Sequence, residues 1–269
     1  MRFLVPLGAA LALITTMPTF AATGDARTPK DVHWSFESPI GHYDRAEVQR
    51  GFQVYKEVCS ACHSLNRVAF HDLVTTHEDP TSGIGFTEAQ AKALAAGYKV
   101  PAGPNDKGET TDANGQPLTR PGVLADHFPP PFPNEDAARA ANSGALPPDL
   151  SLINKAREGG PQYVYSIATG FKEKPPAGFH VLANKYYNPY FAGWNISMPP
   201  PLSDNQVSFS DGTKSDIDHE ARAVAAFLAW ASEPKMEERK QVGFGVLAFL
   251  ILLSILFYLS YRRVWHGKH

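Results

Sequence analysis

Cys59-Ser60-Ala61-Cys62-His63 is the stretch of sequence on which the predicted fold depends, and it holds the only two cysteines of the chain. The spacing C-x-x-C-H is the attachment signature of a c-type haem. Both thiols form thioethers with the porphyrin vinyl groups, and the adjacent histidine is placed to ligate the iron. We therefore predict one covalently bound haem c, attached through Cys59 and Cys62, with His63 as an axial iron ligand.

Three other uses of this cysteine pair are weaker. A redox dithiol of the thioredoxin type would need a flanking strand–helix pattern, and none is visible. A zinc site would need two further ligands at zinc spacing, but there is no second cysteine pair. A disulfide between residues three apart would be strained.

Elimination among the four methionines suggests the second axial ligand. Met1 and Met17 lie in a segment expected to be removed, and Met236 lies a few residues before a predicted membrane span. Met198 remains, followed by three prolines that would stiffen its loop. A methionine opposite a histidine is usual in haem electron carriers.

Two alternatives to Met198 stay open at this point. A lone methionine is often a gap-filling core residue, and bis-histidine ligation could use His127 or His180 instead. With two protein ligands the iron has no open position for a substrate. We therefore expect electron transfer, with no catalysis by this chain alone.

Periodic and capping signals predict a mainly α domain with long irregular loops. Asp44 is placed to cap a helix with Glu47 at the capping-box position, and the apolar face of that helix ends just before Cys59. Further helices are expected over 135–142 after Asn134, over 161–170, and from Ser215 with Asp218 through residue 231. Residues 100–122 are dense in Pro, Gly, Asn and Asp and predict a surface loop.

The two ends of the chain are apolar and predict its topology. Residues 1–22 have one positive charge, a short apolar core and small residues at the end, which is typical of a secretory signal peptide; an uncleaved anchor is the alternative. Residues 242–261 carry no charge and are long enough to span a bilayer, although a buried core helix has the same composition. Arg262 and Arg263 follow, so residues 23–241 should be external and 262–269 cytoplasmic.

The charge of the external domain bears on its partners. Outside the signal and the anchor region there remain 21 Lys and Arg against 27 Asp and Glu, a net charge of −6. This balance is poorly suited to nucleic acid and well suited to steering a basic protein partner. Simple solubility would explain the charge equally well.

Several long strings, in order along the whole mature chain, resemble the cytochrome c1 family, the haem subunits of the cytochrome bc1 complex. The strings are Arg50–Tyr55 leading into C-x-x-C-H, Arg120-Pro121-Gly122 with Asp126–Pro129, Ala137–Asn142, Gly144–Ser151, Tyr187–Phe191, Met198-Pro199, Asp211–Thr213, and Phe227–Trp230 through Glu233-Pro234. The C-terminal anchor completes the likeness. The C-x-x-C-H motif alone names only a class of haem protein, but the proline-containing strings are specific.

The resemblance implies the site and the partners. The family's haem cysteines match Cys59 and Cys62, its axial ligands match His63 and Met198, and its propionate-contacting arginine resembles Arg120, which could otherwise be a solvated loop residue. Family members accept an electron from the Rieske iron–sulfur protein and pass it to a soluble c-type cytochrome. They are anchored in membrane lipid beside cytochrome b, in respiratory or photosynthetic chains. The bacterial type of the family places the haem domain in the periplasm, on the inner membrane, in a dimeric complex.

Two other functions compete with this one. A free-standing, membrane-tethered cytochrome could act as an electron shuttle, but that function suits a small haem domain on a flexible tether. Here more than two hundred external residues join the anchor through about ten. A haem enzyme such as a peroxidase would need an open iron position, which ligation by Met198 would fill.

Overall fold

The computed structural model describes residues 25–267, so the predicted signal peptide lies outside the described residues. Helices dominate, as expected: α1 (Arg45–Glu57), α2 (Glu88–Ala96), α3 (Glu135–Ala141), α4 (Ile153–Ala156), α5 (Pro161–Gly170), α6 (Ile217–Ser232) and α7 (Met236–Trp265). Two 3₁₀ turns, η1 (Cys59–Ala61) and η2 (Phe70–Leu73), are the other helical elements. The strands form two short antiparallel pairs, β1 (Lys99–Pro101) with β2 (Thr119–Pro121) and β3 (Tyr186–Tyr187) with β4 (Asn195–Ile196).

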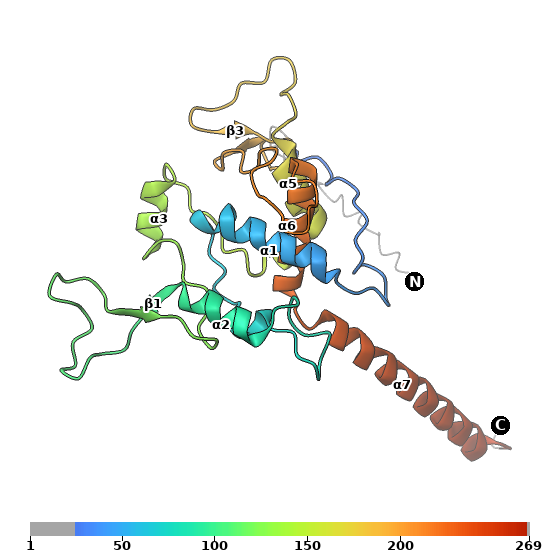
Figure 1. Ribbon diagram of the computed structural model, residues 1–269. Helices are drawn as coiled ribbons and strands as arrows, with labels where there is room; N and C mark the ends of the chain where they lie inside the picture. Colours follow the sequence, from blue (N-terminus) through green and yellow to red (C-terminus); the bar gives the residue numbers. More distant parts are fainter. Residues whose placement is uncertain (1–24, 268–269) are drawn as a thin grey trace, which may run out of the picture.

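The centre of the domain is the contact between α1 and α6, which cross each other in Figure 1. Gly51 makes the approach close, because a Cβ atom there would lie only 1.9 Å from the carbonyl oxygen of Ala223. The rings of Phe52 and Tyr55 on α1 pack against Phe227 on α6, at centroid distances of 5.5 and 5.7 Å. Helix α5 packs on α6 as well. The predicted apolar face of α1 therefore forms the core from which the cysteine motif emerges.

Most helix starts agree with the sequence. The side chain of Asp44 accepts from the backbone N–H groups of Ala46 and Glu47, and that of Asn134 accepts from Ala137. Pro161 is the first residue of α5. Glu47 does not close the expected capping box: its carboxylate accepts from Nε of Arg222 at 2.8 Å.

Two further expectations need correction. The cap of α6 is Asp216, which accepts from the backbone N–H of His219, whereas the Ser215 hydroxyl donates to the buried carboxylate of Glu220 at 2.5 Å. The 100–122 segment is not a loop throughout: its ends pair as β1 and β2, with Val100 opposite Arg120. The residues between these strands extend away from the domain (Figure 1).

Helix α7 leaves the rest of the molecule as a single isolated helix (Figure 1). Its 30 residues extend about 45 Å at the α-helical rise. Within residues 25–267 it is the one helix long and apolar enough to cross a membrane, and its apolar side chains are exposed. It is not a buried core helix, which was the alternative for residues 242–261.

Candidate functional site: the C-x-x-C-H turn and its surroundings

One tight turn brings Cys59, Cys62 and His63 together. Helix α1 ends at Glu57, and the carbonyl oxygen of Cys59 then accepts from the backbone N–H groups of Cys62 at 3.1 Å and His63 at 2.9 Å. Cys59 is partly buried against the main core, and Cys62 is exposed. The turn therefore presents two thiols and an imidazole from five consecutive residues.

The His63 ring is held in the tautomer that an iron ligand needs. Its Nδ1 lies 2.8 Å from the carbonyl oxygen of Pro148. A carbonyl can only accept, so Nδ1 carries the hydrogen and Nε2 keeps its lone pair. Burial lowers the pKa of His63, although the Pro148 carbonyl and Asp149 oppose that shift, so the ring is favoured in its neutral form. Ligating histidines commonly donate their second N–H to a carbonyl in this way.

Asp149 fixes the backbone that carries the Pro148 carbonyl. One carboxylate oxygen accepts from the Ser64 hydroxyl at 2.7 Å and from the Asn66 backbone N–H at 2.9 Å. The other accepts from the backbone N–H of Ser151, also at 2.9 Å. Burial raises the pKa of Asp149, but these hydrogen bonds outweigh it and the net shift is downward. The ionised Asp149 thus ties the 148–151 segment to the residues just after His63.

The cysteine environment argues against a redox dithiol. Burial, assisted by the neighbouring Cys62, raises the pKa of the Cys59 thiol to about 12. Reactive redox cysteines have lowered pKa values in electropositive surroundings. Within residues 25–267 the structure shows no group of three or more His, Cys, Asp or Glu side chains that could hold a metal ion.

Met198 packs against a different apolar cluster from the one that Cys59 contacts. It follows β4 and packs against a small apolar cluster of Ile167, Tyr190 and Ile196. Its neighbour Ser197 accepts a hydrogen bond from Nζ of Lys185 at 2.5 Å. The Met198 side chain is partly buried.

Arg120 lies on β2 and forms a bidentate ion pair with Asp126, with N–O distances of 2.6 and 2.7 Å. The pair lowers the pKa of Asp126 to about 2. The Arg120 side chain remains 42% exposed. The Arg120 side chain is therefore held by its ion pair and is not a freely solvated loop residue.

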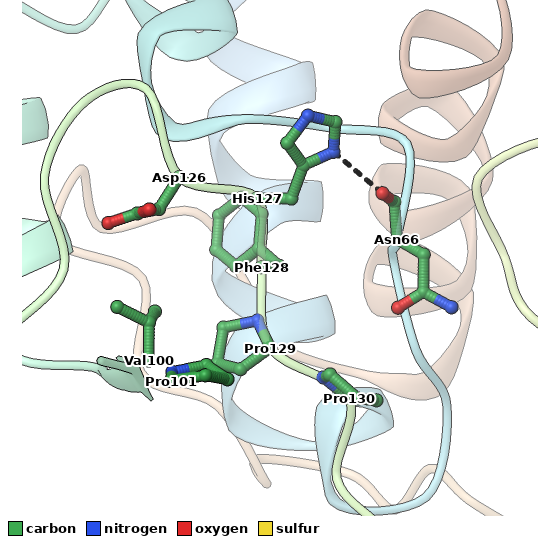
Figure 2. A pocket seen from close by; sticks show the side chains of 8 residues that line it. All are labelled: Asn66, Val100, Pro101, Asp126, His127, Phe128, Pro129 and Pro130. Carbon is green, nitrogen blue, oxygen red and sulfur yellow. Dashed lines mark hydrogen bonds between the residues drawn. The ribbon is translucent and has the colours of Figure 1, made fainter. Parts of the chain in front are cut away.

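A cavity of about 280 Å³ lies beside this ion pair, and Figure 2 shows its lining. His127 stands at its edge, with Nδ1 2.7 Å from the carbonyl oxygen of Asn66. Its wall is completed by Val100, Pro101, Asp126, Phe128, Pro129 and Pro130. The cavity extends from the Arg120–Asp126 ion pair to Asn66, which lies three residues after His63. The other histidine considered as an iron ligand, His180, is exposed.

Sequence reasoning missed Pro148 and Asp149 as parts of this site. Both lie inside the proline-containing string Gly144–Ser151, which carried only the family resemblance. An aspartate after two prolines was the available signal, but two of its three partners, Ser64 and Asn66, lie more than eighty residues away in the chain.

The donor set fits haem c: two thiols on one turn, an imidazole with a free Nε2, and a thioether on a separate loop. A mainly helical domain around this turn, joined to a membrane helix, defines a membrane-anchored c-type cytochrome. The model of the Cytochrome C1 family matches residues 34–268. The chain therefore belongs to the cytochrome c1 family, the haem subunits of the ubiquinol–cytochrome c reductase (bc1) complex, and serves electron transport in the respiratory chain.

Similar proteins come from bacteria and from mitochondria. The chain is 44% identical to cytochrome c1 of Rhodospirillum rubrum, over 88% of this chain and 87% of that protein. It is 42% identical to a mitochondrial cytochrome c1 haem protein of Arabidopsis thaliana, over 98% and 81%. It is also 42% identical to cytochrome b/c1 of Bradyrhizobium diazoefficiens, but it spans only 40% of the length of that protein.

Proposed function

We propose that this chain carries one haem c and relays single electrons from the Rieske iron–sulfur protein to a soluble c-type cytochrome. Cys59 and Cys62 hold the haem covalently, and His63 and Met198 are the axial iron ligands. The observation that carries this proposal is the hydrogen bond from His63 Nδ1 to Pro148, which orients a neutral imidazole with Nε2 free. Haem c, when bound, supplies a reversible one-electron iron couple.

Met198 and Arg120 complete the proposed haem site. Ligation by Met198 would fill the second axial position and exclude small-molecule ligands. Its placement after β4, against a small apolar cluster, keeps its thioether in a defined loop. Arg120, held by Asp126, is our candidate for the haem propionate contact, next to the cavity that leads to Asn66.

The joint between the domain and α7 favours a fixed relay over a mobile shuttle. Glu237, in the first turn of α7, accepts from the backbone N–H of Tyr43 at 2.8 Å and pairs with Arg45 at 3.1 Å. Lys240 donates to three backbone carbonyls of residues 36–41. Met236 is buried in the main core. A flexible tether would lack such contacts.

The topology completes the proposal. Residues 1–22 are a signal peptide, 23–241 the periplasmic haem domain, 242–261 the membrane span and 262–269 the cytoplasmic tail, in a bacterial inner membrane. The chain works beside cytochrome b in a dimeric complex that supports proton-translocating respiratory or photosynthetic electron transport. Quinol oxidation belongs to the partner subunits, so this chain does not catalyse alone.

Purification in mild detergent tests the relay. We expect the tagged chain to bring b-type haem with it, and reduced-minus-oxidised spectra to show c- and b-type haems that titrate separately. Recovery of c-type haem without any b-type haem would refute the complex and favour the shuttle. Strong carbon monoxide binding at neutral pH without denaturant would instead refute Met198 ligation.

A further inference from the structure

A four-residue turn ahead of α1 is attached to the beginning of α7. In Ser38-Pro39-Ile40-Gly41 the backbone N–H of Gly41 donates to the carbonyl of Ser38 at 2.9 Å. The ammonium group of Lys240 donates to the carbonyl oxygens of Ser38 at 2.8 Å and Gly41 at 3.0 Å, on both sides of Pro39 and Ile40. The blue segment before α1 bends back beside the start of α7 in Figure 1.

This attachment fixes the height of the turn relative to the membrane. Lys240 precedes Val242, the first residue of the uncharged run, by two positions, or about 3 Å along the helix axis. Side chains on a helix point toward its N-terminus, so Lys240 reaches back toward the domain. The headgroup zone is roughly 5–7 Å deep on each side of the hydrocarbon core. With α7 across the membrane, the backbone carbonyls that Lys240 binds lie close to the outer edge of the headgroup zone.

The residue at the tip of the turn is unsuited to water. Ile40 is 81% exposed, more than any other large apolar side chain in residues 25–267. Turns in water are usually built from Gly, Pro, Asn, Asp and Ser, so Ser38, Pro39 and Gly41 are ordinary turn residues and Ile40 is the exception. A single exposed apolar residue needs no explanation by itself. Here, however, the turn is bonded to Lys240, two positions before the exposed apolar surface of α7 that starts with Val242, and the turn itself carries no charged side chain.

We propose that Pro39 and Ile40 insert into the lipid headgroup region and form a second membrane contact of the haem domain. With α7 this gives two points of attachment, so the domain resists rocking about the helix. The proposal depends on α7 crossing the membrane and is independent of the iron ligands. The occupant is lipid, because the turn is tied to the lipid-exposed start of α7 by Lys240.

A depth measurement on the full complex in phosphatidylcholine vesicles tests the proposal. Ile40→Cys is labelled with bimane, and quenching is compared for nitroxide at the lipid headgroup, nitroxide midway along the acyl chain, and iodide in the water. We expect loss of fluorescence with the headgroup nitroxide and little loss with the other two. Val246→Cys, inside α7 and half exposed, should be quenched by the acyl-chain nitroxide.

The matched control is Leu182→Cys, an exposed apolar residue on the segment between α5 and β3, at the opposite end of the molecule from α7 (Figure 1). It should be quenched by iodide alone. An Ile40 label that behaves like Leu182 overturns the proposal, and so does a label shielded from all three quenchers, which would indicate another subunit. Labelling of Cys59 or Cys62 in the unvaried complex would contradict covalent haem attachment and leave the turn unaffected.

Discussion

At the scale of single residues, His63 shows how the orientation of a proposed iron ligand depends on a distant segment. The carbonyl that selects its tautomer belongs to Pro148, and Asp149 holds that carbonyl by three hydrogen bonds to residues 64, 66 and 151. The ring is thus oriented by a network of the folded chain. The same network makes the site sensitive to changes that never touch the iron.

Replacement of Met198 tests the second axial ligand. We expect Met198→Leu to keep covalent haem but to lower the reduction potential by on the order of 100 mV, because the axial ligand is a main determinant of potential. Spectroelectrochemical titration measures the change. Met236→Leu, at the buried start of α7, is the control and should leave the potential unchanged. An unchanged potential in Met198→Leu contradicts the assignment.

The hydrogen bonds that the Asp149 carboxylate accepts should stabilise the fold, and acid should remove this stabilisation. Its pKa is lowered by folding, so its contribution is fully present above the unfolded value near ~3.9 and is lost as pH falls through the folded value. Asp149→Asn should reduce the free energy of unfolding by about 1–3 kcal/mol at neutral pH. It should also flatten the loss of stability below about pH 4.

Denaturant unfolding of the external domain at a series of pH values measures both effects. Asp106→Asn, in the exposed segment between β1 and β2, is the control and should reproduce the unvaried profile. If Asp149→Asn also reproduces that profile, the Asp149 carboxylate makes no contribution to the free energy of unfolding.

At the scale of elements, the packing of α1 on α6 supports the turn that carries the cysteines. A Cβ at Gly51 would lie 1.9 Å from the Ala223 carbonyl oxygen, so Gly51→Ala must separate the two helices. Overpacking of this kind costs about 1–3 kcal/mol or more. We expect a lower denaturation midpoint and less covalent haem, measured on the expressed chain. Gly103→Ala, where no atom lies within 4 Å of the added Cβ, should behave as the unvaried chain.

Helix ends show how far local signals go. Asp44, Asn134 and Pro161 were predictable because each acts on its own first turn. The predicted start of α6 was wrong because Ser215 and Asp216 both suit an N-cap, and a tertiary contact decides between them. The buried Glu220 carboxylate takes the Ser215 hydroxyl, which leaves Asp216 for the helix.

The hairpin of β1 and β2 was missed for a related reason. Pro101 and Pro121 are the last residues of their three-residue strands, and such composition indicates a loop. Pairing between Val100 and Arg120 joins residues twenty apart and leaves no periodic trace in the sequence. It nevertheless places Arg120 beside Asp126 and the cavity of Figure 2.

At the scale of the whole molecule, the haem-binding motif could be predicted from the sequence, but the long-range contacts that hold its surroundings in place could not. The C-x-x-C-H motif is contiguous and could be read from the sequence, whereas Met198 as the second axial ligand followed from elimination and stays a prediction. The Pro148 carbonyl and the Lys240 joint connect segments separated by 85 to about 200 residues. Such contacts are properties of the assembled domain and of its attachment to α7.

The charge of the external domain leads to a prediction about its soluble partner. A net charge of −6, distributed over residues 23–241, attracts a basic cytochrome over distances comparable to the Debye length, about 10 Å at 0.1 M salt. The rate of electron delivery should therefore fall steadily as ionic strength rises, since steering affects association more than the bound geometry. Stopped-flow oxidation of the reduced complex by a basic c-type cytochrome, at increasing salt, measures this dependence. An acidic c-type cytochrome should show the opposite trend, because salt screens its repulsion. Rates that do not respond to salt with either partner would mean that contacts other than charge bring the acceptor to the domain.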